Sequence, residues 1–315
     1  MTPVTVVTPN PAVDLTYRVD RQRIGRTVRV REVLRRAGGK GLNVARVLHT
    51  LGVEVLAVQP LGGGAGAWVA GELAAQGIRT DSVPVEGETR STVTVVDDVE
   101  HPTVLTEPGP VLDAGTWAAL CERVRIRCAA GGVLVVSGSL PPGAGAGQVA
   151  GLVAAGHEAG ARVVVDVSGP GLLAAAAAGA DLLTPNAEEA REATGAADLE
   201  AAVHRLLGAG ARGVVVSRGT AGLLAVDGQG RCEHPAVPGV AGNPTGAGDA
   251  ATAGIAAAWA RQAPPEVALR WAAVLGAAAV LRPSAGEVDP ADLPALAARL
   301  PGLPAPLQPF SLPVP

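Results

Sequence analysis

Short runs of apolar residues recur along the chain, and segments with helical character separate most of them. The strand-like runs are Val4–Thr8, Val53–Leu61, Val133–Ser137, Val163–Val167, Asp181–Leu183, Gly213–Ser217 and Leu223–Val226. The helix-like segments are Leu42–Leu51, Gly66–Ala75, Ala114–Arg127, Gln148–His157, Leu199–Leu207 and Ala251–Ala260. Several strand-like runs are flanked by apolar residues on both sides, as strands covered on both faces are. This alternation predicts an α/β fold with a mostly parallel sheet, whose ligands bind beyond the carboxyl ends of the strands.

Two segments, Val13–Leu34 and Thr89–Thr106, break this pattern. They alternate charged and apolar residues without a helical period, and we expect a turn near Asp97-Asp98. Such alternation is typical of strands with one face in water. The two segments could pair into a small sheet that projects from the main body like a lid. The last fifteen residues contain six prolines, which predicts an extended or disordered tail.

Composition excludes several classes of function. The chain of 315 residues is 48% hydrophobic, which is enough for one large core or two smaller ones. A net charge of −4 without a basic run argues against a nucleic-acid partner. Cys121, Cys128 and Cys232 form no Cys-x-x-Cys pair, so we expect reduced thiols. No signal peptide is visible, and the longest apolar run, Trp271–Leu281, is too short to span a bilayer, which predicts a cytoplasmic protein without a membrane partner.

The stretch Asn243–Ala250, with the sequence Asn-Pro-Thr-Gly-Ala-Gly-Asp-Ala, leads straight into an alanine-rich helix. A turn of small residues at a helix start leaves N–H groups unpartnered, and the helix dipole adds positive charge, so Gly246, Ala247 and Gly248 form a candidate anion site. Asp249 places a base beside it. This pairing suits phosphoryl transfer, in which the base accepts a hydroxyl proton while amides stabilise the transferring oxygens. The alternative is an ordinary glycine-rich turn.

Lys40 is the only lysine, since the other 24 of the 25 basic residues are arginines. It lies in the turn Gly38-Gly39-Lys40-Gly41, shortly before Asn43. An ammonium is a compact charge that fits tight turns where a guanidinium does not, so we interpret its retention as a chemical need. The alternative is chance.

Together, these two stretches resemble the two signature regions of the ribokinase-like (PfkB) carbohydrate kinases, the Gly-Gly-Lys-Gly-x-Asn turn and the Gly-Ala-Gly-Asp turn. The resemblance covers roughly residues 3–290. It implies a three-layer α/β/α sandwich with a mostly parallel central sheet and a small inserted β-sheet lid, often used for dimer contacts. Residues 1–300 would form the kinase domain, with lid strands at about 13–34 and 89–106, followed by the tail 301–315. We therefore expect a homodimer through the lid.

The resemblance also implies roles for single residues. Asp249 would be the catalytic base, with Gly246, Ala247 and Gly248 as the anion hole. The nucleotide side would comprise Asn186, Ser217, Arg218, Gly219, Thr220, Gly222 and Gly248, and Glu189 would bind Mg²⁺ through water. ATP and Mg²⁺ are thus the expected cosubstrate and metal. The alternatives are a plain hairpin turn at 217–222 and, for Glu188 and Glu189, a solvated first helical turn.

The acceptor side would comprise Asp14, Arg29, Gly38, Gly39, Lys40, Asn43, Arg90 and Ser139. The stretch Ser137–Gly143, Ser-Gly-Ser-Leu-Pro-Pro-Gly, is similar to one in the phosphosugar branch of the family. The stretch Thr8–Asp14 and the Gly-Glu-Thr-Arg run at Gly87–Arg90 are most similar to the 1-phosphofructokinases of that branch. Arg29 and Arg90 would both lie on the lid and face the site, which suits an acceptor that already carries a phosphate. The alternatives are ordinary surface arginines and, for Asn43, a helix cap.

The resemblance implies an ATP-dependent kinase of a hexose phosphate, with fructose 1-phosphate first and tagatose 6-phosphate and fructose 6-phosphate next. Thr184 departs from the family pattern where Lys-Pro-Asn is common, and Asn243 stands where the ribokinase branch has Asp, which puts dependence on a monovalent cation in doubt. Other classes are a kinase of an unphosphorylated sugar or nucleoside and a non-catalytic sugar-phosphate sensor. The glycine run Leu61–Gly66 suggests a dinucleotide-dependent oxidoreductase, but it lacks the Gly-x-Gly-x-x-Gly spacing after the first strand.

Overall fold

A computed structural model of the protein describes residues 2–97, 102–128 and 131–300. The predicted turn near Asp97-Asp98 falls partly outside the described residues, because Asp98 is not among them. The proline-rich segment 301–315 also lies outside the described residues. The central sheet has the strand order β13-β12-β11-β10-β9-β8-β1-β4-β5. Its strands are β1 (Val4–Val7), β4 (Val55–Leu61), β5 (Arg79–Pro84), β8 (Val133–Ser137), β9 (Arg162–Asp166), β10 (Leu182–Leu183), β11 (Gly213–Ser217), β12 (Leu223–Asp227) and β13 (Gly230–His234). Neighbours from β5 to β11 pair in parallel, whereas β12 and β13 are antiparallel.

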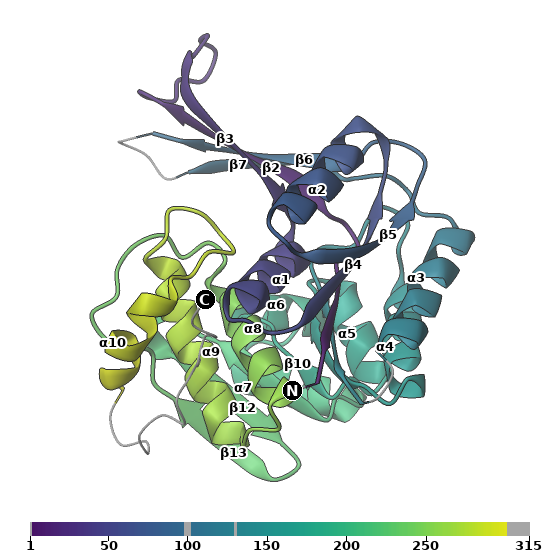
Figure 1. Ribbon diagram of the computed structural model, residues 1–315. Helices are drawn as coiled ribbons and strands as arrows, with labels where there is room; N and C mark the ends of the chain where they lie inside the picture. Colours follow the sequence, from purple (N-terminus) through teal and green to yellow (C-terminus); the bar gives the residue numbers. More distant parts are fainter. Residues whose placement is uncertain (1, 98–101, 129–130, 301–315) are drawn as a thin grey trace.

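Helices cover both faces of this sheet, as the alternation of apolar runs predicts (Figure 1). One face carries α1 (Lys40–Thr50), α2 (Gly63–Ala75), α8 (Ala247–Ala260), α9 (Pro265–Val280) and α10 (Leu293–Ala298). The other carries α3 (Ala114–Arg127), α4 (Ala146–Glu158), α5 (Pro170–Ala177), α6 (Ala187–Thr194) and α7 (Leu199–Ala209). Side chains alternate along a strand, so Val6 of β1 packs in the first core and Val7 in the second. The valine-rich strands therefore hold both helix layers together.

The predicted lid is a separate sheet of order β3-β2-β6-β7, which projects from the body (Figure 1). Its strands are β2 (Ala12–Val19), β3 (Val30–Gly38), β6 (Arg90–Val96) and β7 (Thr103–Thr106). The central pair, β2 and β6, is parallel, and both outer pairs are antiparallel. This confirms that the two alternating segments pair with each other. The end of the lid nearest the body contains Ala12 of β2, which lies opposite Gly38 and Arg90.

The sequence-based bounds of most core elements agree with the structure within two or three residues. The exceptions are β5 and β13, which are polar edge strands without a continuous apolar run, and the helices α5, α6, α9 and α10, which are absent from the helix-like segments of the sequence analysis. Sequence analysis recorded α9 only as an apolar run. Among the described residues, no helix has both the length and the apolar character needed to cross a membrane. The site described next lies where α1, α6 and α8 begin, beyond the carboxyl ends of the parallel strands.

Candidate active site

Asp249 lies in the first turn of α8, three residues after Gly246, which caps the helix with a left-handed backbone at φ 83°. Its carboxylate is buried, and Asn43 Nδ2 of α1 donates a hydrogen bond to Oδ2 at 2.8 Å. The pKa of Asp249 is raised to about 7, mainly by burial and next by the charge of the nearby Asp166, while the hydrogen bond from Asn43 acts in the opposite direction. A carboxyl group with this pKa can accept and release a proton near neutral pH.

The backbone amides at this helix start differ from the predicted anion site in one respect. The N–H of Ala247 donates to the carbonyl oxygen of Pro244 at 3.1 Å, so it is already satisfied within the turn. Within the described ranges, the N–H groups of Gly246, Gly248 and Asp249 have no hydrogen-bond partner. The free donors therefore come from the residues on either side of Ala247, and Ala247 supplies the turn.

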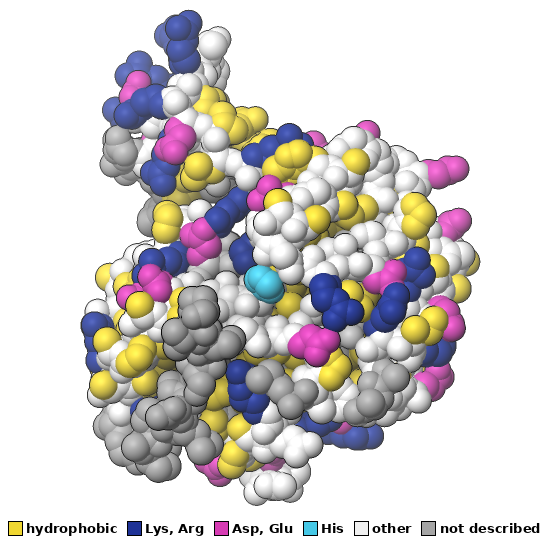
Figure 2. All heavy atoms as spheres, in the orientation of Figure 1, with side chains coloured by type: hydrophobic (Ala, Val, Ile, Leu, Met, Phe, Trp, Pro, Cys, Tyr) yellow, Lys and Arg dark blue, Asp and Glu magenta, His cyan; other side chains and the backbone are white. Residues whose placement is uncertain are grey.

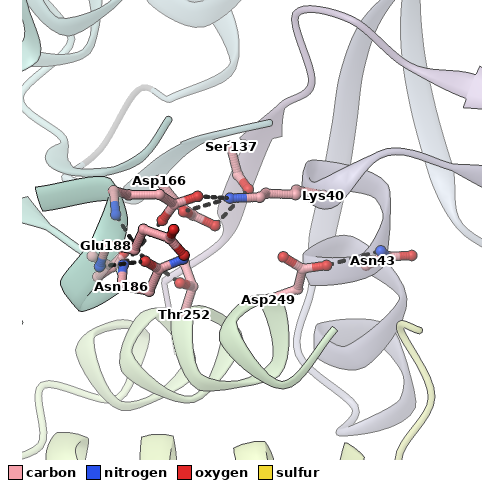
Figure 3. Close-up of polar contacts among 10 residues, drawn as sticks. Lys40, Asn43, Ser137, Asp166, Asn186, Glu188, Asp249 and Thr252 are labelled. Carbon is pink, nitrogen blue, oxygen red and sulfur yellow. Dashed lines mark hydrogen bonds and ion pairs between the residues drawn. The ribbon is translucent and has the colours of Figure 1, made fainter. Parts of the chain in front are cut away.

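Lys40 is the first residue of α1, and its ammonium joins two carboxylates. Nζ lies 2.9 Å from Glu189 Oε1 and 3.6 Å from Asp166 Oδ1. Figure 3 shows Lys40 pointing toward Asp166, and Asn43 pointing toward Asp249. Burial alone lowers the pKa of Lys40, but the two carboxylates outweigh it and raise this pKa overall. Lys40 therefore stays charged, and it faces the region that sequence analysis assigned to nucleotide and metal.

Asp166 is a site residue that sequence analysis included only within the strand-like run Val163–Val167. It ends β9, is buried, and accepts a hydrogen bond from Ser137 Oγ of β8 at 3.1 Å. Burial raises its pKa, while the ammonium of Lys40 lowers it. The available signal was its position as a carboxylate directly after a run of valines, at the edge of the sheet where ligands bind.

Asn186 and Glu189 cap α6. Asn186 Oδ1 accepts hydrogen bonds from the N–H groups of Glu188 and Glu189, both at 2.9 Å, and Glu189 Oε2 accepts one from the N–H of Asn186 at 3.0 Å. Glu188 is exposed, and the ammonium of Lys40 pairs with Glu189 and Asp166 instead, so the solvated-helix alternative describes Glu188. Glu189 instead turns its second oxygen to Lys40, and so the cap fixes the carboxylate in the site.

A cavity of about 710 Å³ extends from this polar cluster between the turn after β11 and the helix α9. Its polar end is lined by Lys40, Asp166, Thr184, Asn186, Glu189, Gly246, Gly248 and Asp249. Its apolar end is lined by Leu223, Val237, Val240, Ala272, Ala273, Gly276 and Ala277. Sequence analysis missed this apolar end, because only the fold brings α9 and the segment before Gly246 together. The small side chains on α9 leave room for a flat ligand.

The predicted nucleotide turn lines the cavity only in part. Ser217, Gly219, Thr220 and Gly222 face it. Arg218 does not line it, because its guanidinium donates to Glu233 at 2.9 Å and to backbone carbonyls of Ala221 and Leu223. The structure thus gives Arg218 a role in holding the turn against β13.

The acceptor side lies across Asp249 from the cavity, at the base of the lid. Asp14 of β2 is half-buried, and burial raises its pKa although the backbone of Gly39 and the charge of Arg90 lower it. A Cβ atom at Gly38 would fall 2.0 Å from this carboxylate, so only glycine leaves it in place. Asn43 and Asp249 complete a polar wall that sugar hydroxyls could contact.

The two predicted lid arginines are placed differently. Arg90 begins β6 and donates to Ser139 Oγ and to the carbonyl oxygen of Asn10, both at 3.2 Å, so it spans the lid and the body. Arg29 is exposed and precedes the outer end of β3, where Val30 pairs with Val19. A single chain therefore brings Arg90, but not Arg29, next to Asp14.

A magnesium ion fits the polar end of the cavity in a hydrated form. Among the described residues, no group of three acidic, histidine or cysteine side chains is arranged to hold a metal. The oxygens of Glu189 and Asp166 already accept hydrogen bonds, but carboxylate oxygens have further lone pairs. Mg²⁺ usually keeps several waters and takes one or two carboxylates plus phosphate oxygens, and this donor set suits that mode of binding.

Comparisons with known proteins show the family and the fold of the chain. A family model described as pfkB family carbohydrate kinase matches residues 7–292. The 1-phosphofructokinase of Xanthomonas campestris pv. campestris is 38% identical over an alignment of 265 residues, and the match covers 80% of this chain and 82% of that protein. Two structures of phosphofructokinase-2 from Escherichia coli, with potassium and with fructose-6-phosphate, have TM-scores of 0.89 and 0.86. Each is 28% identical and covers 95% of this chain and 99% of its own. Arabidopsis thaliana ribokinase, at 22% identity, TM-score 0.75 and coverage of 94% of this chain and 98% of its own, shares the fold.

Proposed function

The chain belongs to the pfkB family of carbohydrate kinases, and we propose that it transfers the γ-phosphoryl group of ATP to a hydroxyl of a hexose phosphate, with fructose 1-phosphate as the first candidate acceptor. Tagatose 6-phosphate and fructose 6-phosphate are the next candidates. The observation that carries the proposal is the buried carboxylate of Asp249, which has a pKa of about 7 and lies beside free backbone amides at the polar end of a large cavity. A base and an anion site in contact are what phosphoryl transfer to a hydroxyl requires.

In the proposed reaction, Asp249 accepts the proton of the acceptor hydroxyl. Asn43 occupies Oδ2, so Oδ1 is the oxygen that takes the proton. The acceptor oxygen then forms a bond to the γ-phosphorus while the bond from that phosphorus to the bridging oxygen of ADP breaks. The N–H groups of Gly248 and Asp249 donate to the oxygens of the transferring group and stabilise their charge.

We assign the cavity to the nucleotide. The apolar end suits the purine ring of ATP, between Val237 and the small residues of α9. The turn at Ser217–Gly222 would hold the ribose and the phosphates of ATP. Glu189, with Asp166 behind it, would hold the hydrated Mg²⁺. When bound, this ion neutralises phosphate charge and orients the γ-phosphoryl group. Lys40 adds a fixed positive charge at the same end.

The acceptor would bind against Asp14, Gly39 and Asn43, with its phosphate on Arg90 and Ser139. Arg90 suits this role because its guanidinium is half-buried and planar, and it can donate to a phosphate from a fixed position. Two guanidinium donors already lie on neutral oxygens of Ser139 and Asn10, and a phosphate oxygen is a stronger acceptor than either.

We also propose a homodimer through the lid. Val33, Val104 and Leu105 are exposed apolar residues of the lid sheet. Figure 2 shows basic side chains gathered on the outer lid, where Arg26 and Arg29 are exposed. A second copy that packs against the lid would cover these apolar residues. Arg29 of the first copy could then contact the substrate bound in the site of the second copy. Sedimentation of the wild type and of Val33→Asp would test the assembly.

The experiment that tests the proposed function is a panel of acceptors with purified protein, ATP and Mg²⁺, read by ADP release. The panel comprises fructose 1-phosphate, fructose 6-phosphate, tagatose 6-phosphate, fructose, ribose and adenosine. We expect the highest kcat/KM with fructose 1-phosphate and the lowest with the unphosphorylated compounds. A preference for fructose, ribose or adenosine over every hexose phosphate would contradict the assignment of Arg90.

A further inference from the structure

Arg46 is a buried arginine, only 8% exposed, on α1, the helix that follows the lid strand β3. Its guanidinium makes three hydrogen bonds to different parts of the fold. Nη1 donates to Asn43 Oδ1 at 3.1 Å, Nη2 to the carbonyl oxygen of Ala37 at 2.6 Å, and Nε to Gln76 Oε1 at 3.1 Å. An arginine this deeply buried is unusual unless it is paired, so its partners identify what it does.

The contact with Asn43 fixes which way the Asn43 amide points. A guanidinium can only donate hydrogen bonds, so Asn43 must present its oxygen to Arg46. The amide nitrogen is then the group that faces Asp249, where it donates at 2.8 Å. In the reverse orientation, the amide oxygen would face the carboxylate and repel its charged form. Arg46 therefore determines that Asn43 donates to Asp249.

Gly286 closes over this pair. A Cβ atom at Gly286 would lie 2.6 Å from Asn43 Oδ1 and 2.7 Å from Arg46 Nη1. The residue also has φ +72°, a conformation that favours glycine. The backbone of this segment thus covers the hydrogen bond between Arg46 and Asn43, so the bond is shielded from water. Next to it, Glu287 forms an ion pair with Arg36 of the lid strand β3.

The other partners of Arg46 connect this arrangement to the lid. Ala37 belongs to β3 and directly precedes the Gly38-Gly39 pair through which the lid continues into α1. Gln76 is the C-cap residue of α2. The guanidinium thus holds the inner end of a lid strand, a neighbouring helix and the amide beside Asp249 in one fixed arrangement.

We infer that Arg46 is a positioning residue for phosphoryl transfer: it holds the Asn43 amide so that this amide donates to Asp249 and leaves the other carboxylate oxygen for the acceptor hydroxyl. The inference rests on the proposed function, because it takes Asp249 as the base. Arg46 itself touches neither the nucleotide cavity nor the reacting atoms. Its loss should act on kcat and on the ionisation of Asp249 more than on substrate affinity.

The main test is Arg46→Met, with Arg270→Met as the matched control. Arg270 of α9 is a half-buried arginine that donates to the carbonyl oxygen of Ala297 and does not line the cavity. We expect Arg46→Met to lower kcat about ten- to a hundredfold, since a hydrogen bond that acts on a charged group is at stake. KM for ATP should change little, and KM for the acceptor, which Asn43 would also contact, should change less than kcat. Arg46→Lys, which keeps a donor, should recover part of the loss. Arg270→Met should leave kcat within about twofold of the wild type.

The dependence of kcat/KM on pH separates a positioning role from a structural one. The charged groups around Asp249 are Lys40 of α1, Asp166 of β9 and Asp14 of β2, and those around Arg46 are Arg36, Asp14, Glu287 and Glu72. All of them remain in Arg46→Met. The hydrogen bond from Asn43 lowers the pKa of Asp249, so its loss should shift the acidic limb of the profile to higher pH. An unshifted limb would overturn the inference.

Gly286→Ala disrupts the same contact without removing the arginine, and Gly179→Ala is its matched control. Gly179 has φ +77° but nothing within 4 Å of the Cβ position, so it reports backbone strain alone. We expect Gly286→Ala to reproduce the loss of kcat and the shifted profile, and Gly179→Ala to change only the melting temperature. Equal kcat in the two variants would contradict the inference.

A double mutant shows whether Arg46 acts through Asn43. In an Asn43→Ala background, Arg46→Met should cost less than about twofold in kcat, because the contact it supports is already gone. A full and additive loss would overturn the inference. Asp249→Asn decides the proposed function separately: if this variant stays active, the base assignment is wrong. If it is inactive while Arg46→Met is silent, only the inference about Arg46 fails.

Discussion

The ammonium of Lys40 lies 2.9 Å from Glu189 Oε1, and this contact joins the start of α1 on one face of the sheet to the start of α6 on the other. Lys40 also lies 3.6 Å from Asp166, so one compact cation is shared by two carboxylates at the polar end of the cavity. The only lysine of the chain is therefore part of an ion-pair cluster.

Exchange of Lys40 for arginine should reduce activity. A planar guanidinium is larger than an ammonium and cannot place one point charge between Glu189 and Asp166, so it should crowd the phosphates. We expect Lys40→Arg to lower kcat/KM at least about tenfold, near 1.4 kcal/mol of transition-state stabilisation, with little change in melting temperature. Steady-state kinetics and thermal melting measure both quantities.

The matched control for this exchange is Arg79→Lys, because Arg79 pairs with Glu54 at an exposed site. Its effect on stability should be within about 0.5 kcal/mol, and its kinetics should not change. Lys40→Met should differ from Lys40→Arg, since removal of the cation leaves the buried Asp166 carboxylate unpaired and lowers the melting temperature. Unchanged kinetics in Lys40→Arg would refute a functional role for the ammonium.

Activity should rise with pH through the pKa of Asp249. The base accepts a proton only in its ionised form, and burial raises its pKa to about 7. We expect kcat/KM to increase about tenfold per pH unit below 7 and to level off above it. The phosphate group of the sugar phosphate also titrates, with a pKa of about 6. Its titration must therefore be measured separately by phosphorus NMR, and its contribution removed from the pH profile of kcat/KM. A flat profile between about pH 5.5 and 8.5 would exclude a base with this pKa.

Truncation of Arg90 should weaken binding of the sugar phosphate selectively. Arg90→Ala removes a charged donor that lies 3.2 Å from Ser139 Oγ, on the acceptor side of Asp249. Because hydrogen bonds to charged groups contribute about 1.5–3 kcal/mol, we expect KM for the sugar phosphate to rise roughly ten- to a hundredfold while KM for ATP changes little. Arg231→Ala, which removes an exposed arginine paired with Glu233, is the control. An equal rise in both KM values would contradict the assignment.

Much of the fold follows from local patterns in the sequence. The valine-rich runs specify buried parallel strands because every residue meets an apolar layer on one face or the other, as Val6 and Val7 do. The alternating segments specify the lid because every second residue is polar, which predicts strands with one face packed and the other face in water. An edge strand such as β13 has no comparable signal in the sequence, because its residues are mostly exposed and polar.

The site could be predicted where short-range sequence carries the chemistry, and not where the fold brings distant residues together. Asp249 and Asn43 belong to recognisable turns, and the structure joins them by a hydrogen bond. Arg46 is, in the sequence, one of many arginines, and its burial depends on Ala37 and Gln76. Arg218 shows the converse, because its place in a motif does not reveal that its side chain turns to β13.

The most direct test of the proposed mechanism is the turnover of Asp249→Asn with fructose 1-phosphate, ATP and Mg²⁺, measured together with calorimetric binding of both substrates. Asparagine keeps the size of the side chain and its contact with Asn43 but cannot accept the hydroxyl proton at neutral pH. The mechanism predicts that kcat falls about 10²–10⁴-fold while both substrates bind with nearly normal affinity. A variant that keeps more than about a tenth of the wild-type kcat would contradict the assignment of Asp249 as the base.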